Sequence, residues 1–158
     1  MNSICCVKDL RFAYKKEKAV LSGVSFSAAA NEIIGIIGKN GSGKSTLLNI
    51  IAGFIKGYDG NVFINNEDAR ILTLKERAKT ISYIPQKKIA IPDYYTVEDF
   101  VMEGCRPFRN LGLYKPEDYK NMDKILADCK LTAFKNKLIS ELSGGEMQRC
   151  IFARAIMK

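Results

Sequence analysis

The sequence predicts an α/β fold in which an N-terminal part with antiparallel strands is followed by a helical subdomain. A short apolar run, "EIIGIIG" (32–38), leads through a glycine-rich turn into a segment whose apolar residues recur at helical spacing. After Pro92 the pattern changes, because segments 96–104 and 115–131 both have the composition and the start signals of helices. The 158 residues are enough for one domain with a sizeable core.

The expected elements follow in chain order. Strand-like composition marks 4–14, 24–28, 61–65 and 81–85, and the run 32–38 suits a strand that is buried on both faces. Helices are expected from about residue 43, over 73–80, over 96–104 with Thr96 as cap, over 115–131 with Pro116 in the first turn, and from Ser143 onward. We therefore divide the chain into a core part (1–91), a helical subdomain (92–141) and a final helix with the residues that precede it (142–158).

The composition is that of an ordinary globular protein, with 47% apolar and 27% charged residues. No apolar run approaches the roughly 18–20 residues that cross a bilayer, and no signal peptide is visible, so we expect the protein to start out in the cytosol. The net charge is +8, but the lysines are dispersed and do not alternate with aromatic residues. A solvated surface explains them better than a nucleic-acid partner.

Five cysteines are present, and they form no C-x-x-C pair: Cys5, Cys6, Cys105, Cys129 and Cys150. There is also no histidine to complete a mixed metal site. Small buried thiols in a reducing compartment are the simplest interpretation.

The segment "GKNGSGKST" (38–46) matches the phosphate-loop pattern G-x-x-x-x-G-K-[ST] between an expected strand and an expected helix. Backbone N–H groups of such a loop converge on phosphates, and the helix that begins near Gly43 adds its unpaired N–H groups. Lys44 would reach the β- and γ-phosphates, Ser45 would ligate Mg²⁺, and Thr46 would donate to the α-phosphate. The expected nucleotide-binding residues of the loop are Gly38, Asn40, Gly41, Ser42, Gly43, Lys44, Ser45 and Thr46. The alternative is a glycine-rich turn with an incidental lysine.

A second glycine cluster, "SGGE" (143–146), fits the capping box S-x-x-E. Capping explains Ser143 and Glu146, but it leaves Gly144 and Gly145 unexplained, and each of these costs a helix about 1 kcal/mol relative to alanine. A second phosphate that approaches bare N–H groups would account for both glycines.

With its flanks, "LSGGEMQRCIFARAI" (142–156) resembles the signature motif of the ATP-binding-cassette (ABC) ATPases, and together with the phosphate loop the match is highly specific. In that family two nucleotide domains pair head to tail, and ATP lies between the phosphate loop of one chain and the signature of the other. The resemblance implies that Ser143, Gly144 and Gly145 contact the γ-phosphate bound by a second ABC subunit, with ATP and Mg²⁺ as cofactors.

Two further residues match family motifs. Tyr14 resembles the aromatic residue that stacks on adenine, and its alternative is a core tyrosine at a strand end. Gln86, in "ISYIPQ", resembles the glutamine that reaches Mg²⁺ and the attacking water, and its alternative is an exposed polar residue after a strand. The resemblance also implies that the helical stretch 92–140 docks on a transmembrane permease subunit.

The family carries further parts after the signature helix: an Mg²⁺-linked aspartate, the adjoining catalytic glutamate and a switch histidine. The sequence ends at Lys158 without them, so we expect a C-terminally truncated cassette that lacks the C-terminal strands. Such a chain would bind nucleotide, hydrolyse ATP poorly or not at all and aggregate readily, because part of the catalytic charge and part of the sheet would be missing.

The leading interpretation is the ATPase subunit of an ABC transporter at the cytoplasmic face of the cell membrane. Segment 94–113 resembles, less closely, the importers of iron–siderophore complexes, haem and cobalamin. A soluble ABC protein that acts on ribosomes and a non-catalytic nucleotide-binding fragment are the alternatives. A DNA-acting member is disfavoured, because no sustained heptads separate the phosphate loop from the signature.

Overall fold

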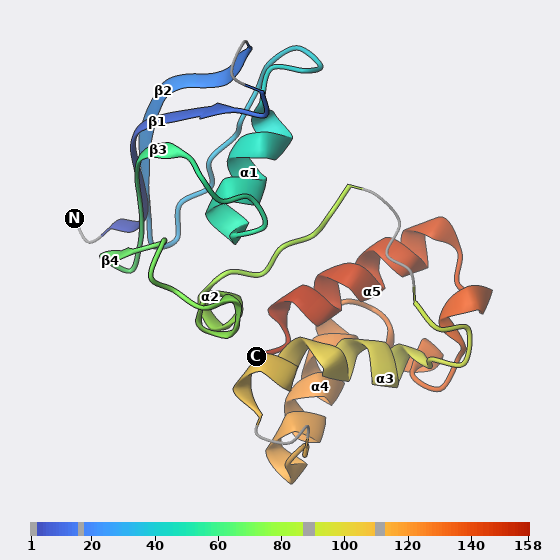
Figure 1. Cartoon of the computed structure of the whole chain (residues 1–158). Helices are drawn as coiled ribbons and strands as arrows, with labels where there is room; N and C mark the ends of the chain where they lie inside the picture. The colour runs from blue at the N-terminus through green and yellow to red at the C-terminus, as the bar shows by residue number, and fades with distance from the viewer. Residues whose placement is uncertain (1–2, 16–17, 87–90, 110–112) are drawn as a thin grey trace. The chain divides into compact units, whose positions relative to one another are not determined.

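The computed structural model describes residues 3–15, 18–86, 91–109 and 113–158. These residues divide into two compact units, Met1–Ile81 and Ser82–Lys158, and each unit is described by itself. Figure 1 shows the elements of both along the chain.

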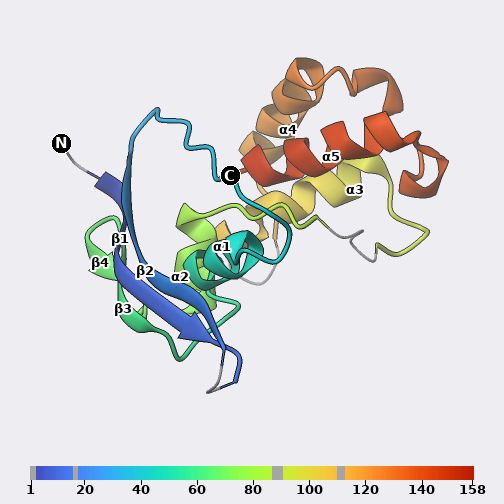
Figure 2. The ribbon, with the colours of Figure 1, turned by 90° about the horizontal axis from the view of Figure 1, so that it is seen from above.

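The first unit is a four-stranded antiparallel sheet with a helix on one face. The strands are β1 (Ser3–Ala13), β2 (Ala19–Ala29), β3 (Asp59–Ile64) and β4 (Glu67–Asp68), in the spatial order β2-β1-β3-β4. Helix α1 (Lys44–Ala52) lies against the sheet, and α2 (Leu74–Thr80) follows β4 (Figures 1 and 2). Leu47 and Ile50 of α1 join the core of the unit, which also contains Val7, Leu10, Leu21, Val62, Ile64 and Ala69.

Three strands of this unit and both of its helices confirm the sequence prediction. The predicted strands 4–14 and 61–65 correspond to β1 and β3, and the predicted strand 24–28 is the last half of the longer β2. Thr73 caps α2 in a capping box, because its hydroxyl accepts from Glu76 N while the Glu76 carboxylate accepts from Thr73 N.

The predicted strand over 32–38 is wrong, and so is the one over 81–85. Both segments have no strand assignment, and Ile33 and Ile37 are 98% and 97% exposed. A strand forms only when a neighbouring strand completes its hydrogen-bond ladder, and an apolar composition alone does not supply that neighbour. In the described residues, the named strands pair only with one another, and neither segment is among them.

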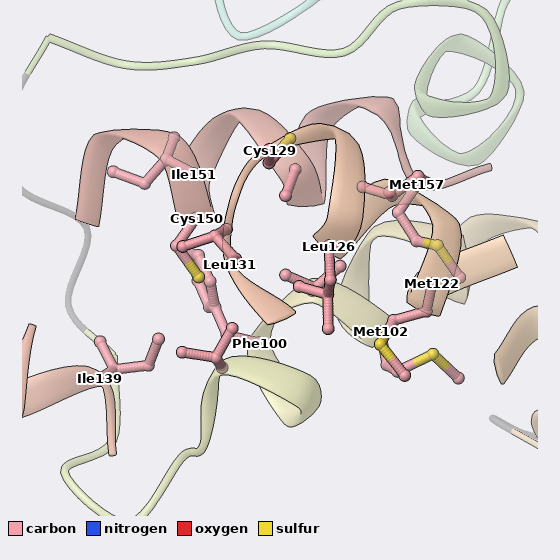
Figure 3. Packing of buried hydrophobic residues seen from close by; sticks show 14 of the residues in the cluster. Phe100, Met102, Met122, Leu126, Cys129, Leu131, Ile139, Cys150, Ile151 and Met157 are labelled. Carbon is pink, nitrogen blue, oxygen red and sulfur yellow. The ribbon is translucent and has the colours of Figure 1, made fainter. Parts of the chain in front are cut away.

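The second unit consists of short helices around one core. Its α-helices are α3 (Val97–Met102), α4 (Pro116–Asp128) and α5 (Gly144–Ile156), and its 3₁₀ turns are η1 (Glu103–Phe108), η2 (Thr132–Phe134) and η3 (Ile139–Glu141). Figure 3 shows Phe100 of α3, Leu126 of α4 and Cys150 of α5 in the shared core. None of the helices that the structure describes has the length and apolar character needed to cross a bilayer.

The helix starts predicted for this unit are confirmed. Thr96 forms a capping box with Asp99 at the start of α3, and Pro116 is the first residue of α4. The interpretation of the cysteines as buried thiols holds for Cys105, Cys129 and Cys150, whereas Cys5 and Cys6 are half-buried, and all five are free. Burial raises the pKa of the Cys150 thiol to about 12, so this thiol is neutral and unreactive at physiological pH.

Candidate functional site

The glycine-rich loop 38–43 runs directly into the N-terminus of α1. The Ser42 amide donates to the Lys39 carbonyl at 3.2 Å, and the first helical bond runs from Leu47 N to Gly43 O at 2.8 Å. Gly43 has a φ of +92°, and a Cβ there would lie 2.8 Å from both Leu21 Cδ2 and Val20 O on β2. Only glycine therefore allows the loop to turn into α1 this close to the sheet.

Lys44 folds its side chain back over the loop. Its Nζ donates to the Gly38 carbonyl at 2.7 Å and to the Lys39 carbonyl at 2.8 Å, so the ammonium group is held beside the backbone that the glycines leave bare. The first turn of α1 contains no acidic residue, and Gly38–Ser42 are exposed. A fixed cation, free helix N–H groups and the absence of a competing carboxylate suit a polyphosphate.

Tyr14 lies at this loop, at the end of β1. Its hydroxyl shares a 3.2 Å hydrogen bond with the hydroxyl of Thr46, which is itself only 7% exposed. The Tyr14 ring meets Phe12 edge to face at 4.9 Å and remains 63% exposed. Ser45 is exposed on the first turn of α1. The structure thus brings Tyr14, Ser45, Thr46 and Lys44 together at one end of the first unit.

The second unit presents its own helix N-terminus at α5. Ser143 caps this helix in the predicted capping box: Ser143 N donates to the Glu146 carboxylate at 2.7 Å, and Glu146 N donates to Ser143 Oγ at 3.4 Å. The backbone hydrogen bond from Ser143 is the main reason that the pKa of Glu146 is lowered. A Cβ at Gly144 or Gly145 would meet no neighbouring atom of the described residues within 4 Å, so packing in this part of the chain does not require either glycine.

Gln86 lies beside the same helix. It is exposed, and together with Gly144, Met147 and Gln148 it lines an open cavity of about 500 Å³ in the second unit. The phosphate loop belongs to the first unit, whereas Gln86 and Ser143–Gly145 belong to the second. The roles of Ser45 and Gln86 as shared Mg²⁺ ligands therefore stay predictions.

Sequence reasoning missed one buried charged residue near the loop helix. Arg77 of α2 is 7% exposed, and its guanidinium reaches the C-terminal end of α1. Its place in a short helix among lysines and glutamate carries no signal of burial, because arginine is ordinary at an exposed helix position.

Comparison with known proteins gives consistent results. The family model described as "ABC transporter" matches residues 21–158. The chain is 35% identical over 96% of its length to the "Probable iron chelatin transport ATP-binding protein" of Helicobacter pylori, and it covers 60% of that protein. It is also 35% identical over 95% of its length to the "Manganese transport system ATP-binding protein MntB" of Listeria innocua, covering 61% of it.

Solved structures agree with the relatives. A crystal structure of an ATP-binding cassette of an ABC transporter in its ADP conformation superposes with a TM-score of 0.78 at 30% identity, and the match covers 99% of this chain and 65% of that one. The chain spans 25% to 61% of the length of the curated relatives that it matches.

Proposed function

The chain belongs to the ABC transporter family, and on that premise we propose that it is the ATP-binding subunit, or a part of it, of a membrane transporter. The observation that carries the proposal is the phosphate loop, where the Lys44 ammonium group is held 2.7 Å from the Gly38 carbonyl at the N-terminus of α1. ATP binding and hydrolysis are the general activity of the family, and the arrangement of the loop suits the binding step.

We propose that the chain would hold ATP and Mg²⁺ in the following way. The phosphates would be surrounded by the backbone N–H groups of Gly38, Asn40, Gly41, Ser42 and Gly43. Lys44 would meet the β- and γ-phosphates, and Thr46 would meet the α-phosphate. Tyr14 would stack on adenine with the exposed part of its ring. Ser45 and Gln86 would hold Mg²⁺, which neutralises phosphate charge when bound, and Gln86 would orient the attacking water.

Comparing ATP with AMP tests this assignment. In this assignment the groups at the loop would meet the β- and γ-phosphates, so ATP with Mg²⁺ should bind at least about 100-fold more tightly than AMP. Isothermal titration calorimetry with the purified chain measures both affinities. Equal affinity for the two nucleotides would contradict the assignment, because the binding would then come from the base and ribose alone.

We further propose that a second ABC subunit binds the same ATP through Ser143, Gly144 and Gly145. The open space around both glycines supports this, because no contact with the described residues requires a bare backbone there. A bare backbone at a helix N-terminus lets an anion from a second subunit approach the N–H groups closely.

Replacing both glycines by alanine tests whether they are needed for contact with a phosphate or serve only to start the helix. The Gly144→Ala, Gly145→Ala variant should be as stable as the parent chain or more stable, by up to about 1 kcal/mol for each glycine, because alanine favours the helix and meets no neighbour. ATP-dependent dimerisation, followed by analytical ultracentrifugation, should nevertheless be lost. A variant that is more stable and still dimerises with ATP would show that the glycines do not face a phosphate.

The partner and the cargo that we propose are supported by the family and its relatives rather than by the described residues. We propose that helical segment 92–140 docks on a transmembrane permease subunit at the cytoplasmic face of the membrane. The cargo that we favour is a metal chelate of the iron–siderophore, haem or cobalamin type, supported by segment 94–113 and by the name of the Helicobacter pylori relative. Uptake of radiolabelled iron chelate and of manganese, with and without the gene, distinguishes this cargo from that named for the Listeria innocua relative.

A further inference from the structure

We propose that Arg77 is a positioning residue for nucleotide binding, because it holds the phosphate-loop helix α1 in place from the helix's far end. This inference rests on the proposed function, since it concerns the same loop. The argument comes from the contacts of one buried guanidinium group.

The C-terminal end of α1 needs an external partner. Its last turn contains no basic residue, and its final carbonyls carry the negative end of the helix dipole. The amides of Gly53 and Phe54 satisfy only the carbonyls of Ile50 and Asn49, at 3.0 and 2.9 Å. A cationic side chain from another element of the unit is therefore favoured at this end of the helix.

Arg77 supplies that cation from α2. Its Nη1 donates to the Ile51 carbonyl at 2.8 Å and to the Ile50 carbonyl at 3.3 Å, and its Nη2 donates to the Ala69 carbonyl just after β4. One side chain thus joins α1, α2 and the end of the sheet. Figures 1 and 2 show α2 following the last strand of this unit.

The guanidinium makes these contacts without a carboxylate. Arg77 is 7% exposed, and no ion pair involves it among the residues described. By contrast, Arg70 lies only seven positions earlier and pairs with Asp68 at 2.6 Å on the exposed surface. Burying a charge is costly, and even a buried ion pair can often be replaced by well-packed apolar residues without loss of stability. A buried arginine at this place is best explained by the carbonyls it holds.

Gly53 makes room for the guanidinium. A Cβ at this position would lie 2.7 Å from Arg77 Nε and 2.8 Å from Arg77 Cδ. Gly53 also has a φ of +86°, which ends α1 in the left-handed conformation that glycine favours. The same glycine therefore ends the loop helix and admits the side chain that fixes it.

A rigid helix that is fixed at one end also has its other end fixed in position. Helix α1 has nine residues and is about 14 Å long, so it spans from Arg77 to the phosphate loop as one short rigid rod. Arg77 Nε has no hydrogen-bond partner in the described part of the chain, so all the hydrogen bonds that the described guanidinium makes come from Nη1 and Nη2. In enzymes a displacement of about 1 Å, caused by a mutation far from the chemistry, can cost about 100-fold in rate, so we expect the loss of these bonds to affect the loop.

The test compares Arg77→Met, Arg77→Lys and the control Arg70→Met with the parent chain. Two quantities are measured at a temperature where circular dichroism shows each protein folded: the affinity for Mg-ATP and the hydrogen exchange of the amides in 38–46. Arg77→Met should weaken ATP binding at least tenfold and speed exchange in the loop even without nucleotide. Arg77→Lys should give an affinity and an exchange rate between those of Arg77→Met and the parent, because an ammonium group reaches fewer carbonyls. Arg70→Met should differ from the parent by less than twofold in both quantities.

The outcomes separate positioning from simple stabilisation. If Arg77→Met only lowers the unfolding temperature, while the folded protein binds ATP and exchanges its loop amides like the parent, the inference is overturned. If Arg77→Met does not fold, the same two criteria apply to Arg77→Lys. If the parent itself does not bind ATP, the proposed function fails, and hydrogen exchange of the loop still decides whether Arg77 positions it.

Discussion

Replacing Lys44 by alanine is expected to weaken ATP binding at least about 100-fold, which corresponds to about 2.7 kcal/mol. The Lys44 ammonium group is held over the loop and is already oriented by the Gly38 and Lys39 carbonyls. A charge-assisted contact to a polyphosphate contributes more than a neutral hydrogen bond, and no other side chain of the loop replaces it. Titration of Mg-ATP by calorimetry measures the loss.

Lys39→Ala is the matched control for this variant. Lys39 lies in the same loop and carries the same charge, but it is exposed, and only its backbone carbonyl contacts Lys44. Its substitution should change ATP affinity by less than about threefold, as expected for a solvated surface charge. If both lysines contribute equally, the binding reflects the general positive charge of the chain, and the phosphate-loop assignment is wrong.

Local signals predicted much of the structure correctly. The caps at Thr96 and Ser143 and the first-turn Pro116 are encoded within three or four residues, so the helix starts could be read from the sequence. The phosphate loop is also local, because a glycine pattern and a lysine at fixed spacing define it. Tyr14 is the exception, since only the resemblance to a family placed it at the loop, where the structure shows it bonded to Thr46.

The errors and omissions all involve partners distant in sequence. Segment 32–38 has the composition of a buried strand, yet it has no ladder in the described residues and exposes Ile33 and Ile37. Arg77 is buried because Gly53, 24 positions earlier, leaves space for it. Sequence periodicity reports which face of an element is apolar, but it does not report which neighbour covers that face or which carbonyl a buried cation meets.

The ion pair between Asp118 and Arg109 makes the stability of the second unit depend on pH. Asp118 is 3% exposed and accepts hydrogen bonds from Arg109 Nε at 2.6 Å, from Arg109 Nη2 and from Lys115 N at 2.8 Å. The hydrogen bonds from Arg109 are the main cause that lowers the pKa of Asp118 to about 2. Because the folded pKa lies below the unfolded value of about 3.9, the ionised carboxylate stabilises the fold by about 2.5 kcal/mol above pH 4. That contribution should be lost as the pH falls from about 4 to 2.

Asp118→Asn should therefore remove part of the acid sensitivity together with part of the stability. At pH 7 the variant should lose about 2 to 4 kcal/mol of unfolding free energy, because it leaves the half-buried Arg109 without its counter-ion. Urea unfolding of the parent and of the variant at pH 7 and at pH 2.5 measures both effects, and the difference between the two proteins should shrink at the lower pH. Asp123→Asn on the same helix is the control, since Asp123 is 58% exposed in its pair with Lys135 and should contribute less than about 1 kcal/mol. If the gap between Asp118→Asn and the parent stays constant down to pH 2.5, the carboxylate does not titrate with the fold, and the start of α4 is held by other contacts.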